Sequence, residues 1–475
     1  MKRLMIAAPV SGSGKTLLTC GILELFRRHG EKPCAFKCGP DYIDPMFHRV
    51  VCGYPGANLD SFFLPEDQVR DLLLDTCRRE DAGSAILEGV MGYYDGVSGT
   101  TDKASSYDIA RITKTPVILV VNARGTSLSA AALVRGFQAF RENSRIEGIL
   151  LNRCKKSVAE MIASVIQAEC GIPVVGYVPM EKEFEIKNRH LGLYLPHEMA
   201  DIKERINALA DRMEETVDWE KLLRIAESAE ELPERQPEKL PDVLPEKLAE
   251  VPRNGVACQL EDSDKSPFRV ALARDEAFCF YYQENMRLLE SMGAEIVPFS
   301  PMHDERLPED IDGLIIGGGY PENYGPVLSG NHTMLASVKM ALEGKMPLLA
   351  ECGGFEYLHE SVRGSDGVWY PMVGYFDLRA ERNAALGHFG YVTVTLPDGT
   401  KIRSHEFHYW ESTDPGAAWL AEKPNGKSWR CEHDIDGVQF AGFPHLYYPS
   451  APAFARKFAD NCRNFRKKRG SADER

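Results

Sequence analysis

Short, nearly continuous apolar runs alternate with amphipathic segments over residues 1–222. Strands that are apolar on both faces and joined by helices are typical of a parallel sheet covered on both sides. After the first run, Lys15–Arg28 places its apolar side chains at the spacing of one helix face. We therefore predict an α/β fold with a doubly wound parallel sheet. The predicted strands are Leu4–Ala8, Ala85–Leu87, Pro116–Val121, Ile146–Leu151 and Pro173–Val178.

A second alternation of the same kind begins at Phe268. It predicts strands at Arg269–Ala273, Glu295–Phe299, Gly313–Ile316 and Pro347–Ala350, followed by antiparallel additions at Tyr391–Thr395 and Gly437–Phe440. Between the two regions, six prolines stand among many Glu and Lys residues, a composition that cannot bury enough apolar surface to fold. We predict two α/β domains, 1–222 and 268–475, joined by a charged, Pro-rich linker at 223–267.

The composition excludes several classes of function. The chain has 70 acidic and 56 basic side chains, a formal net charge of −14, and such a surface does not attract nucleic acid or anionic membranes. No apolar run approaches the roughly 20 residues that span a bilayer. The 12 cysteines form no C-x-x-C pair, which suits a reducing compartment. We expect a cytoplasmic protein that binds neither nucleic acid nor membrane, and a homodimer is its candidate oligomeric state.

Residues 9–16, PVSGSGKT, stand between the first predicted strand and the helix that follows it. In that position backbone N–H groups converge on a phosphate, the helix N-terminus adds positive potential, and a lysine supplies a full charge. The hydroxyl of the last residue would face Mg²⁺. The strict motif has glycine where Pro9 stands, so this P-loop is a variant. We predict that it binds a nucleotide through Gly12, Ser13, Gly14, Lys15 and Thr16.

Carboxylates near the ends of predicted strands extend this site. Glu88 ends a strand at the edge of the parallel sheet where ligands bind. Asp41 and Asp44 are spaced three apart around a turn and would share a Mg²⁺ ion with Thr16 and Glu88; capping of the turn is the alternative. Asp95 has the same alternative, as a turn residue before a glycine. We expect contacts to the substrate or its phosphates from Lys37, Tyr42 and Asp95.

The second region contains a strand, then Glu351-Cys352-Gly353-Gly354, then a helical pattern. A sharp turn of this kind exposes the sulfur as a nucleophile, and the helix N-terminus that follows would lower the pKa of the thiol. Such a thiol needs a base, and His445 follows a predicted strand late in the chain. We interpret His405 and His408 as packing residues, because no third metal ligand stands near them. Backbone N–H groups to hold an oxyanion or glutamine are expected at Gly318, Gly319 and Gly353.

Several longer stretches occur together and in order: GPDYIDPMFH at 39–48, NLDSFF at 58–63, EGVMGYYDG at 88–96, RHLGLYLP at 189–196, GGGYPE at 317–322, ECGGF at 351–355 and HEFHY at 405–409. On these stretches, residues 1–222 resemble the ATP-dependent synthetase domain shared by dethiobiotin synthetase and the cobyrinic acid amidating enzymes. Residues 268–475 resemble a class I glutamine amidotransferase domain. Outside the linker, the whole chain resembles the cobyrinic acid a,c-diamide synthase family.

The resemblance implies two linked reactions. Cys352, with His445 as its base, would attack the side-chain amide of L-glutamine and release ammonia. ATP, with Mg²⁺, would phosphorylate an acetate side chain of a cobyrinate-type tetrapyrrole, and ammonia would displace the phosphate. The cycle would repeat on a second acetate. The protein would thus be a glutamine-hydrolysing ligase of cobalamin biosynthesis.

The resemblance leaves alternatives open. Nickel-sirohydrochlorin or hydrogenobyrinate would undergo the same chemistry, and an ATP-driven switch protein with an inactive glutaminase domain is a more distant alternative. The sequence also departs from the pattern. Tyr447 stands where many class I amidotransferases have glutamate and the cobyrinic enzymes have a second histidine, and Trp410 replaces a serine that often follows HEFHY. What orients His445 is left open.

Overall fold

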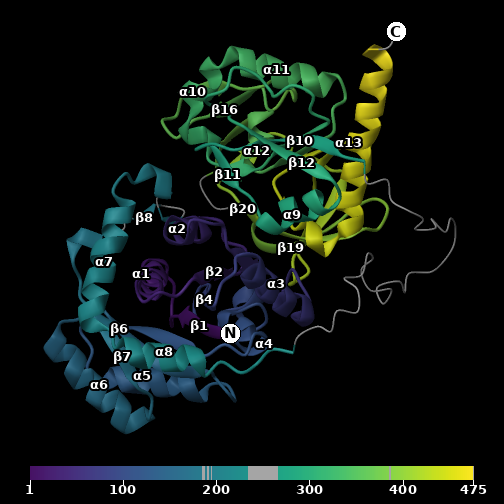
Figure 1. Cartoon of the computed structure of the whole chain (residues 1–475). Helices are drawn as coiled ribbons and strands as arrows, with labels where there is room; N and C mark the ends of the chain where they lie inside the picture. The colour runs from purple at the N-terminus through teal and green to yellow at the C-terminus, as the bar shows by residue number, and fades with distance from the viewer. Residues whose placement is uncertain (185–187, 190–191, 194, 234–265, 384–386, 474–475) are drawn as a thin grey trace.

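The computed structural model describes residues 1–184, 188–189, 192–193, 195–233, 266–383 and 387–473. They form two α/β domains that lie against each other (Figure 1), and the predicted fold class is confirmed. Helix α8 (Trp219–Glu227) runs through residue 222, the predicted end of the first domain. Most of the predicted linker, 234–265, and residues 190–191 and 194 of the RHLGLYLP stretch lie outside the described residues.

The first domain is built on a seven-stranded parallel sheet in the order β3-β2-β4-β1-β5-β6-β7. Alternate residues of β1 enter different apolar clusters: Met5 and Ala7 enter one, Leu4 and Ile6 the other. Both faces of the sheet are therefore covered, as the continuous apolar runs predict. The strands are β1 (Lys2–Ala7), β2 (Pro33–Cys38), β3 (Ala57–Leu59), β4 (Ser84–Glu88), β5 (Val117–Asn122), β6 (Ile146–Asn152) and β7 (Val174–Val178).

All five strands predicted in this domain are present, but the sequence analysis missed β2 and β3. Strand β2 begins with a proline and contains Lys37, so a charge interrupts its apolar run, and β3 has only three residues. The helices that cover the sheet are α1 (Lys15–Arg28), α2 (Ile43–Cys52), α3 (Glu66–Arg79), α4 (Ser106–Ile112), α5 (Leu128–Ala139), α6 (Lys156–Cys170), α7 (Ile202–Thr216) and α8, with a short hairpin of β8 (Asn188–Arg189) and β9 (Gly192–Leu193) before α7.

The second domain has a six-stranded central sheet in the order β12-β10-β13-β15-β25-β24. Its strands are β10 (Phe268–Ala273), β12 (Ala294–Phe299), β13 (Gly313–Ile316), β15 (Leu348–Glu351), β24 (His433–Ile435) and β25 (Gln439–Gly442). The prediction of an antiparallel strand at Gly437–Phe440 was wrong in direction: β25 pairs in parallel with β15, Leu348 opposite Gln439, and only its other neighbour β24 is antiparallel. The central sheet therefore extends one parallel strand further than predicted.

Smaller antiparallel elements and helices complete this domain. The predicted strand Tyr391–Thr395 belongs to β19 (Phe389–Thr395), which pairs antiparallel with β20 (Lys401–Phe407) and β22 (Trp419–Glu422). None of the helices in the described part of the chain is long and apolar enough to cross a membrane. The remaining elements are β11 (Phe278–Phe280), α9 (Gln283–Ser291), β14 (Gly318–Gly319), α10 (Gly325–Gly330), α11 (His332–Glu343), α12 (Gly353–Tyr357), β16 (Ser361–Arg363), β17 (Trp369–Pro371), β18 (Arg379–Arg382), β21 (Trp410–Ser412), β23 (Ser428–Cys431), β26 (His445–Leu446) and α13 (Pro452–Asp473).

Aromatic side chains hold the two domains together. Phe63 of the first domain stacks on Tyr447 of the second with ring centroids 4.7 Å apart, and Phe62 stacks on Tyr391 at 4.5 Å. The Tyr391 hydroxyl donates a hydrogen bond to Asp60 Oδ2 over 2.7 Å. Tyr447 is 1% exposed and belongs to the same apolar cluster as the core of the first domain. The interface is therefore continuous with that core, which fixes the position of one domain against the other.

We expect Tyr391→Phe to weaken this interface. Asp60 is 1% exposed, and a buried polar group that loses a hydrogen-bond partner destabilises a protein by about 1–3 kcal/mol. The matched control is Tyr370→Phe, because Tyr370 donates a similar bond to Asp366 over 2.6 Å at an exposed site. Thermal unfolding followed by calorimetry should show a lower midpoint for Tyr391→Phe alone. Equal midpoints for the two variants would contradict the assignment.

Candidate active site

The phosphate loop links β1 to α1 with two glycines in the left-handed backbone region. Gly12 has φ +73° and Gly14 has φ +87°, a conformation that glycine adopts without steric strain. A Cβ on Gly14 would lie 3.0 Å from Asn152 Nδ2. The same amide donates to the carbonyl of Ser13 over 2.9 Å, and the Ser13 hydroxyl donates to Val10 O over 2.7 Å. These contacts hold the loop in an open curve before the helix begins at Lys15.

Lys15 lies under the loop and is 7% exposed. Its ammonium donates a hydrogen bond to Met91 O over 2.5 Å, and Met91 has a positive φ of 45°, which is uncommon outside glycine. Burial lowers the pKa of Lys15 to about 8, helped by the charge of Lys37. The EGVMGYYDG stretch thus supplies a backbone carbonyl that positions the loop lysine. A phosphate would restore the preference of this lysine for its charged form.

A buried cluster of charges joins the loop to its neighbours. Lys37 Nζ lies 2.5 Å from Asp44 Oδ2 and 3.1 Å from Glu88 Oε1. His48 Nε2 lies 2.6 Å from Glu88 Oε2. Burial opposes the charge on Lys37, but the carboxylates of Asp44 and Glu88 outweigh it and raise its pKa. The sequence analysis missed His48, although it follows Asp44 by four residues, one helical turn, on α2.

The predicted Mg²⁺ ligands come together at the end of the loop. Thr16 Oγ1 lies 2.9 Å from Asp44 Oδ1 and 2.8 Å from Glu88 Oε1. Mg²⁺ prefers oxygen ligands and is commonly held by one or two carboxylates together with substrate phosphates, so this donor set fits the ion. No group of three or more His, Cys, Asp or Glu side chains that could hold a metal occurs in the described residues. The nucleotide would therefore complete the coordination.

Asp41 and Asp95 both make the turn contacts that we left as the alternative. Asp41 Oδ1 accepts hydrogen bonds from the backbone N–H groups of Ile43, over 2.7 Å, and Asp44, over 3.2 Å. Asp95 Oδ2 accepts one from Gly92 N over 3.0 Å. Both charges also act on the site. The charge of Asp41 adds to burial in raising the pKa of Asp44, and the charge of Asp95 favours the charged form of Lys15. The turn role and proximity to the site are therefore compatible.

The second candidate site surrounds Cys352, which lies between β15 and α12. Its backbone has φ +52° and ψ −113°, a strained conformation for a residue with a side chain. A Cβ on Gly354 would lie 1.9 Å from Ile316 O, so only glycine allows the helix to pack here. The expectation of a lowered thiol pKa was wrong. The prediction of an exposed sulfur was wrong too, because Cys352 is only 7% exposed. Burial, with the charges of Glu356 and Glu322, raises the pKa of its thiol. Helix α12 has only five residues, and its dipole is too weak to offset them.

His445 and the predicted glycines lie around this cysteine. A Cβ on Gly318 would lie 2.3 Å from His445 Cε1, and one on Gly353 would lie 3.2 Å from Gly319 N. His445 is 2% exposed, and burial lowers its pKa to about 3, assisted by the two neighbouring histidines. It is therefore a neutral imidazole in the free protein. His405 lies opposite it in the β20–β26 pairing.

The two other histidines are held by packing, as we interpreted them. His408 stacks on Phe443 with centroids 3.9 Å apart. Its Nδ1 lies 2.7 Å from Trp410 O and its Nε2 lies 3.0 Å from Glu406 Oε1. Burial lowers the pKa of His405 to about 4. Both histidines lie near His445, and both contribute to lowering its pKa.

Glu351 is a site residue that the sequence analysis missed. Its Oε2 lies 3.9 Å from His445 Nδ1, and that nitrogen is buried without a hydrogen-bond partner in the described structure. Its Oε1 accepts hydrogen bonds from Tyr448 Oη over 3.2 Å and Leu446 N over 3.4 Å. The one sequence signal that could have identified Glu351 is its position directly before Cys352. Glu351 thus lies beside His445, whereas Tyr447 packs against Phe63 in the domain interface.

Tyr42 connects the two candidate sites. It precedes α2, whose Asp44 faces the phosphate loop, and its ring lies 5.1 Å from the His445 ring, centroid to centroid. It also contacts Phe280 at 5.3 Å and Tyr282 at 4.6 Å. We predicted Tyr42 as a substrate or phosphate contact from the first domain. The structure places it against the histidine of the second.

Comparison with known proteins supports the same division. Residues 4–193 match the CobQ/CobB/MinD/ParA nucleotide-binding domain, and residues 269–446 match the CobB/CobQ-like glutamine amidotransferase domain. A cobyrinate a,c-diamide synthase of Listeria innocua is 37% identical over 95% of this chain and 98% of the relative. The chain belongs to the cobyrinate a,c-diamide synthase family. Another member of the family, from Caldanaerobacter subterraneus, is 36% identical over 98% of this chain and 99% of the relative.

We expect Glu351→Gln to slow glutamine hydrolysis. Burial raises the pKa of Glu351 to about 8, so its carboxyl group is largely neutral until His445 takes the thiol proton. Its carboxylate form then stabilises the imidazolium, and an amide does not. General-base catalysis by a histidine contributes about 10²–10⁴-fold, and Glu351→Gln should remove part of that gain. The kcat for glutamate release should fall, with little change in KM for glutamine. Glu360→Gln is the control, because Glu360 pairs with Arg379 at the surface. An unchanged kcat would show that Glu351 does not act on His445.

Gly318→Ala should disable the same site by steric conflict. The added methyl group would lie 2.3 Å from His445 Cε1, so the imidazole must leave its place. Glutamate release should be lost, and amidation supported by ammonium salts should persist. Gly330→Ala serves as the control, since a Cβ there meets no atom within 4 Å. Full glutaminase activity in Gly318→Ala would disprove the placement of His445.

Proposed function

We propose that this protein is a cobyrinate a,c-diamide synthase, which converts the a and c acetate carboxylates of cobyrinate into amides with ATP and glutamine. The observation that carries the proposal is the contact through Tyr42. A single loop begins the helix that carries Asp44 to the phosphate loop and also places an aromatic ring 5.1 Å from His445. The two candidate sites are thus neighbours across one interface. Relatives of this name that match the chain from end to end support the same function.

In the glutaminase reaction, we assign the nucleophile to Cys352 and the base to His445. The neutral imidazole takes the thiol proton, and the sulfur attacks the amide carbon of glutamine. Backbone N–H groups at Gly319 and Gly353 would stabilise the oxyanion. The protonated His445 then gives its proton to the leaving nitrogen, so ammonia leaves and a thioester remains. Water hydrolyses the thioester to glutamate and restores the thiol.

In the synthetase reaction, Lys15 and the N–H groups of the loop would hold the phosphates of ATP. Mg²⁺, held by Thr16, Asp44 and Glu88, would neutralise phosphate charge. A carboxylate oxygen of the acceptor attacks the γ-phosphorus and ADP leaves, which gives an acyl phosphate. Ammonia attacks its carbonyl carbon and inorganic phosphate leaves with the C–O electron pair. Positioning and charge neutralisation are what phosphoryl transfer requires of a protein, and the buried Lys37 cluster supplies rigidity.

The names of the relatives favour cobyrinate over nickel-sirohydrochlorin or hydrogenobyrinate as the acceptor. All three macrocycles would undergo the same reaction, and mass spectrometry separates them. Each amidation replaces OH by NH₂ and lowers the mass by roughly 1 Da, so the count of amides is read directly. A monomer and a homodimer make the same prediction, because each chain carries both sites.

Cys352→Ala should abolish glutamine-supported amidation and leave amidation with ammonium salts intact. Lys15→Ala should impair amidation with both nitrogen sources, because activation of the carboxylate precedes capture of ammonia. Purified protein is incubated with ATP, Mg²⁺, cobyrinate and either nitrogen source, and product mass and glutamate are measured. Loss of the ammonium-supported reaction in Cys352→Ala would contradict separate sites. ATP hydrolysis without glutamine consumption in the wild type would favour the switch-protein alternative.

A further inference from the structure

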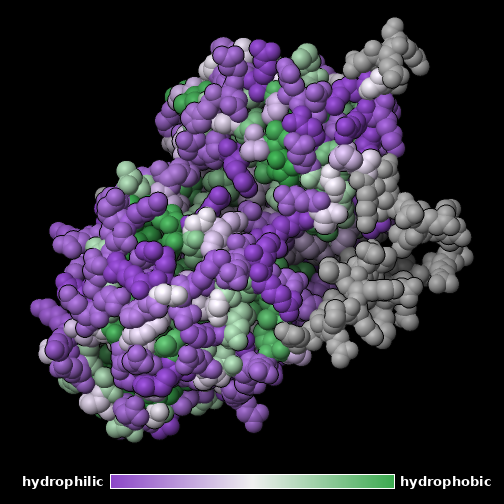
Figure 2. Space-filling model, viewed as in Figure 1, coloured by the Kyte–Doolittle hydropathy of each residue, from purple (hydrophilic) through white to green (hydrophobic). Residues whose placement is uncertain are grey.

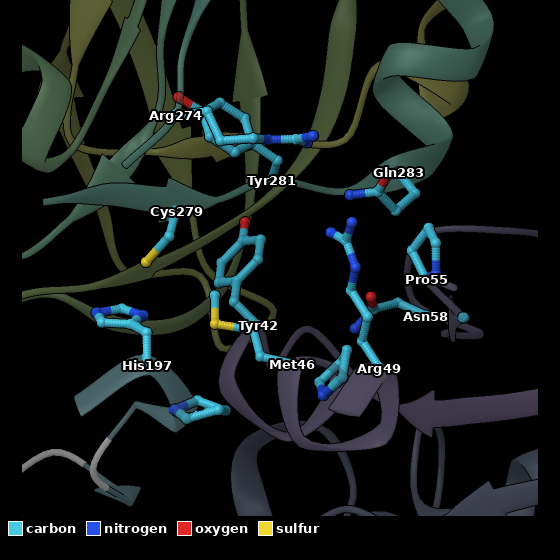
Figure 3. A pocket seen from close by; sticks show the side chains of 13 residues that line it. Tyr42, Met46, Arg49, Pro55, Asn58, His197, Arg274, Cys279, Tyr281 and Gln283 are labelled. Carbon is cyan, nitrogen blue, oxygen red and sulfur yellow. The ribbon is translucent and has the colours of Figure 1, made fainter. Parts of the chain in front are cut away.

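A cavity of about 340 Å³ lies between the two domains. Figure 2 shows the surface hollowed between them. A second cavity of about 290 Å³ adjoins it and shares Pro55, Arg274 and Gln283 with it. The walls of the first cavity come from both domains: α2 and the turn before β3 on one side, and the segment from the end of β10 to the start of α9 on the other (Figure 3). Neither catalytic role assigned above uses the interior of this cavity.

Helix α2 places the cavity one helix width from the phosphate loop. On one face of the helix, Asp44 and His48 contact the Lys37–Glu88 pair. On the other face, Met46 and Arg49 line the cavity, together with Tyr42 just before the helix. Figure 3 shows the Tyr42 hydroxyl and the Arg49 side chain pointing away from α2 toward the second domain. A molecule in the cavity would therefore lie beside both the activating site and Tyr42, which contacts His445.

Two arginines face this cavity without acidic partners. Arg49 comes from the first domain, and Arg274 follows β10 in the second; both remain accessible to solvent. In the described part of the chain, neither has a carboxylate within ion-pair distance, whereas several other arginines of this acidic protein do. Burial, together with the positive charge of Arg49, lowers the pKa of Arg274. Two unpaired guanidinium groups that repel each other across one cavity favour a bound anion.

The other lining residues suit a large, flat ring. Tyr42 and Tyr281 add aromatic surface to its lining, and Pro55 and Met46 add apolar surface. Arginine binds carboxylates through two parallel hydrogen bonds and keeps its charge at all relevant pH values. The cavity thus combines apolar walls with cationic groups at two sides, which is the complement of an apolar ring that carries carboxylates around its rim.

We propose that Arg49 and Arg274 form a composite anion site that holds carboxylates of the acceptor macrocycle other than the one being activated. The inference rests on the proposed function, since it takes the polycarboxylate tetrapyrrole as its ligand. One arginine comes from each domain, so the acceptor binds across the interface. Its reacting carboxylate is directed along α2 toward the phosphate loop. The chain as a whole has a net charge of −14, and this cavity supplies the local positive charge that a polyanion needs.

The test measures binding of cobyrinate separately from turnover. Equilibrium dialysis with cobyrinate, without ATP or glutamine, gives Kd for the wild type, Arg49→Gln, Arg274→Gln and the double variant. Each single change removes a charge-assisted hydrogen bond and should raise Kd about tenfold or more, and the double variant should raise it further. Arg430→Gln is the matched control, because Arg430 is an exposed arginine of the same domain as Arg274, outside both cavities. It should bind as the wild type does.

Arg49→Lys and Arg274→Lys keep the charge and lose the paired geometry, so they should give intermediate Kd values. The KM values for ATP and glutamine should not change in any variant. Unchanged cobyrinate Kd in both Gln variants would overturn the composite site, even if the wild type amidates cobyrinate normally. Wild-type protein that hydrolyses glutamine and ATP but neither binds nor amidates cobyrinate would overturn the proposed function and the composite site together.

Discussion

The first domain depends on the ion pairs that the buried ammonium of Lys37 makes. A charge in the interior is tolerated only when it is paired and hydrogen-bonded, and Lys37 has Asp44, Glu88 and the carbonyl of Gly89 as partners. These partners belong to α2 and to the end of β4, while Lys37 belongs to β2. The cluster therefore fixes the start of α2 against two neighbouring strands. The direction of α2 in turn decides where Tyr42 and Arg49 lie, so a structural ion pair positions residues that face the other domain.

The interface between the domains follows from the same arrangement. Once α2 is fixed, Tyr42 reaches the glutaminase histidine, and the NLDSFF stretch presents Asp60, Phe62 and Phe63 to the second domain. Tyr447 fills the interface where related amidotransferases keep a polar residue, and Glu351 approaches His445 from the other side. The departure at Tyr447 is therefore explained by packing. At this position, a residue that would orient His445 is replaced by Tyr447, which joins the two domains.

Much of this could be read from the sequence, and the failures have physical causes. The strand–loop–helix order located the phosphate loop and the cysteine turn. The loop needs glycine for its positive φ angles, and the turn needs it where a Cβ would clash. Strand β2 was missed because Lys37, near its end, breaks the apolar run, although ion pairs stabilise that buried lysine. His48 and Glu351 were missed because each has its partner far along the chain. Arg49 and Arg274 were missed because only the fold brings them to one cavity. The predicted direction of β25 was wrong because the sequence of a short strand does not indicate which neighbouring strand it pairs with.

The chemistry between the two sites requires that ammonia stay unprotonated, and the residues there satisfy this requirement. His445, with a pKa lowered to about 3 by burial, does not hold a proton that ammonia would take. Around it, Tyr42, Phe280 and Tyr282 are aromatic, and burial raises the pKa of both tyrosines, so they stay neutral. Uncharged aromatic rings also disfavour an ammonium ion beside them, because burying a charge without a partner is costly, and burial raises the pKa of the neighbouring Glu351 to about 8. In the proposed reaction, the same aromatic contacts that hold the domains together therefore also keep the nitrogen nucleophilic.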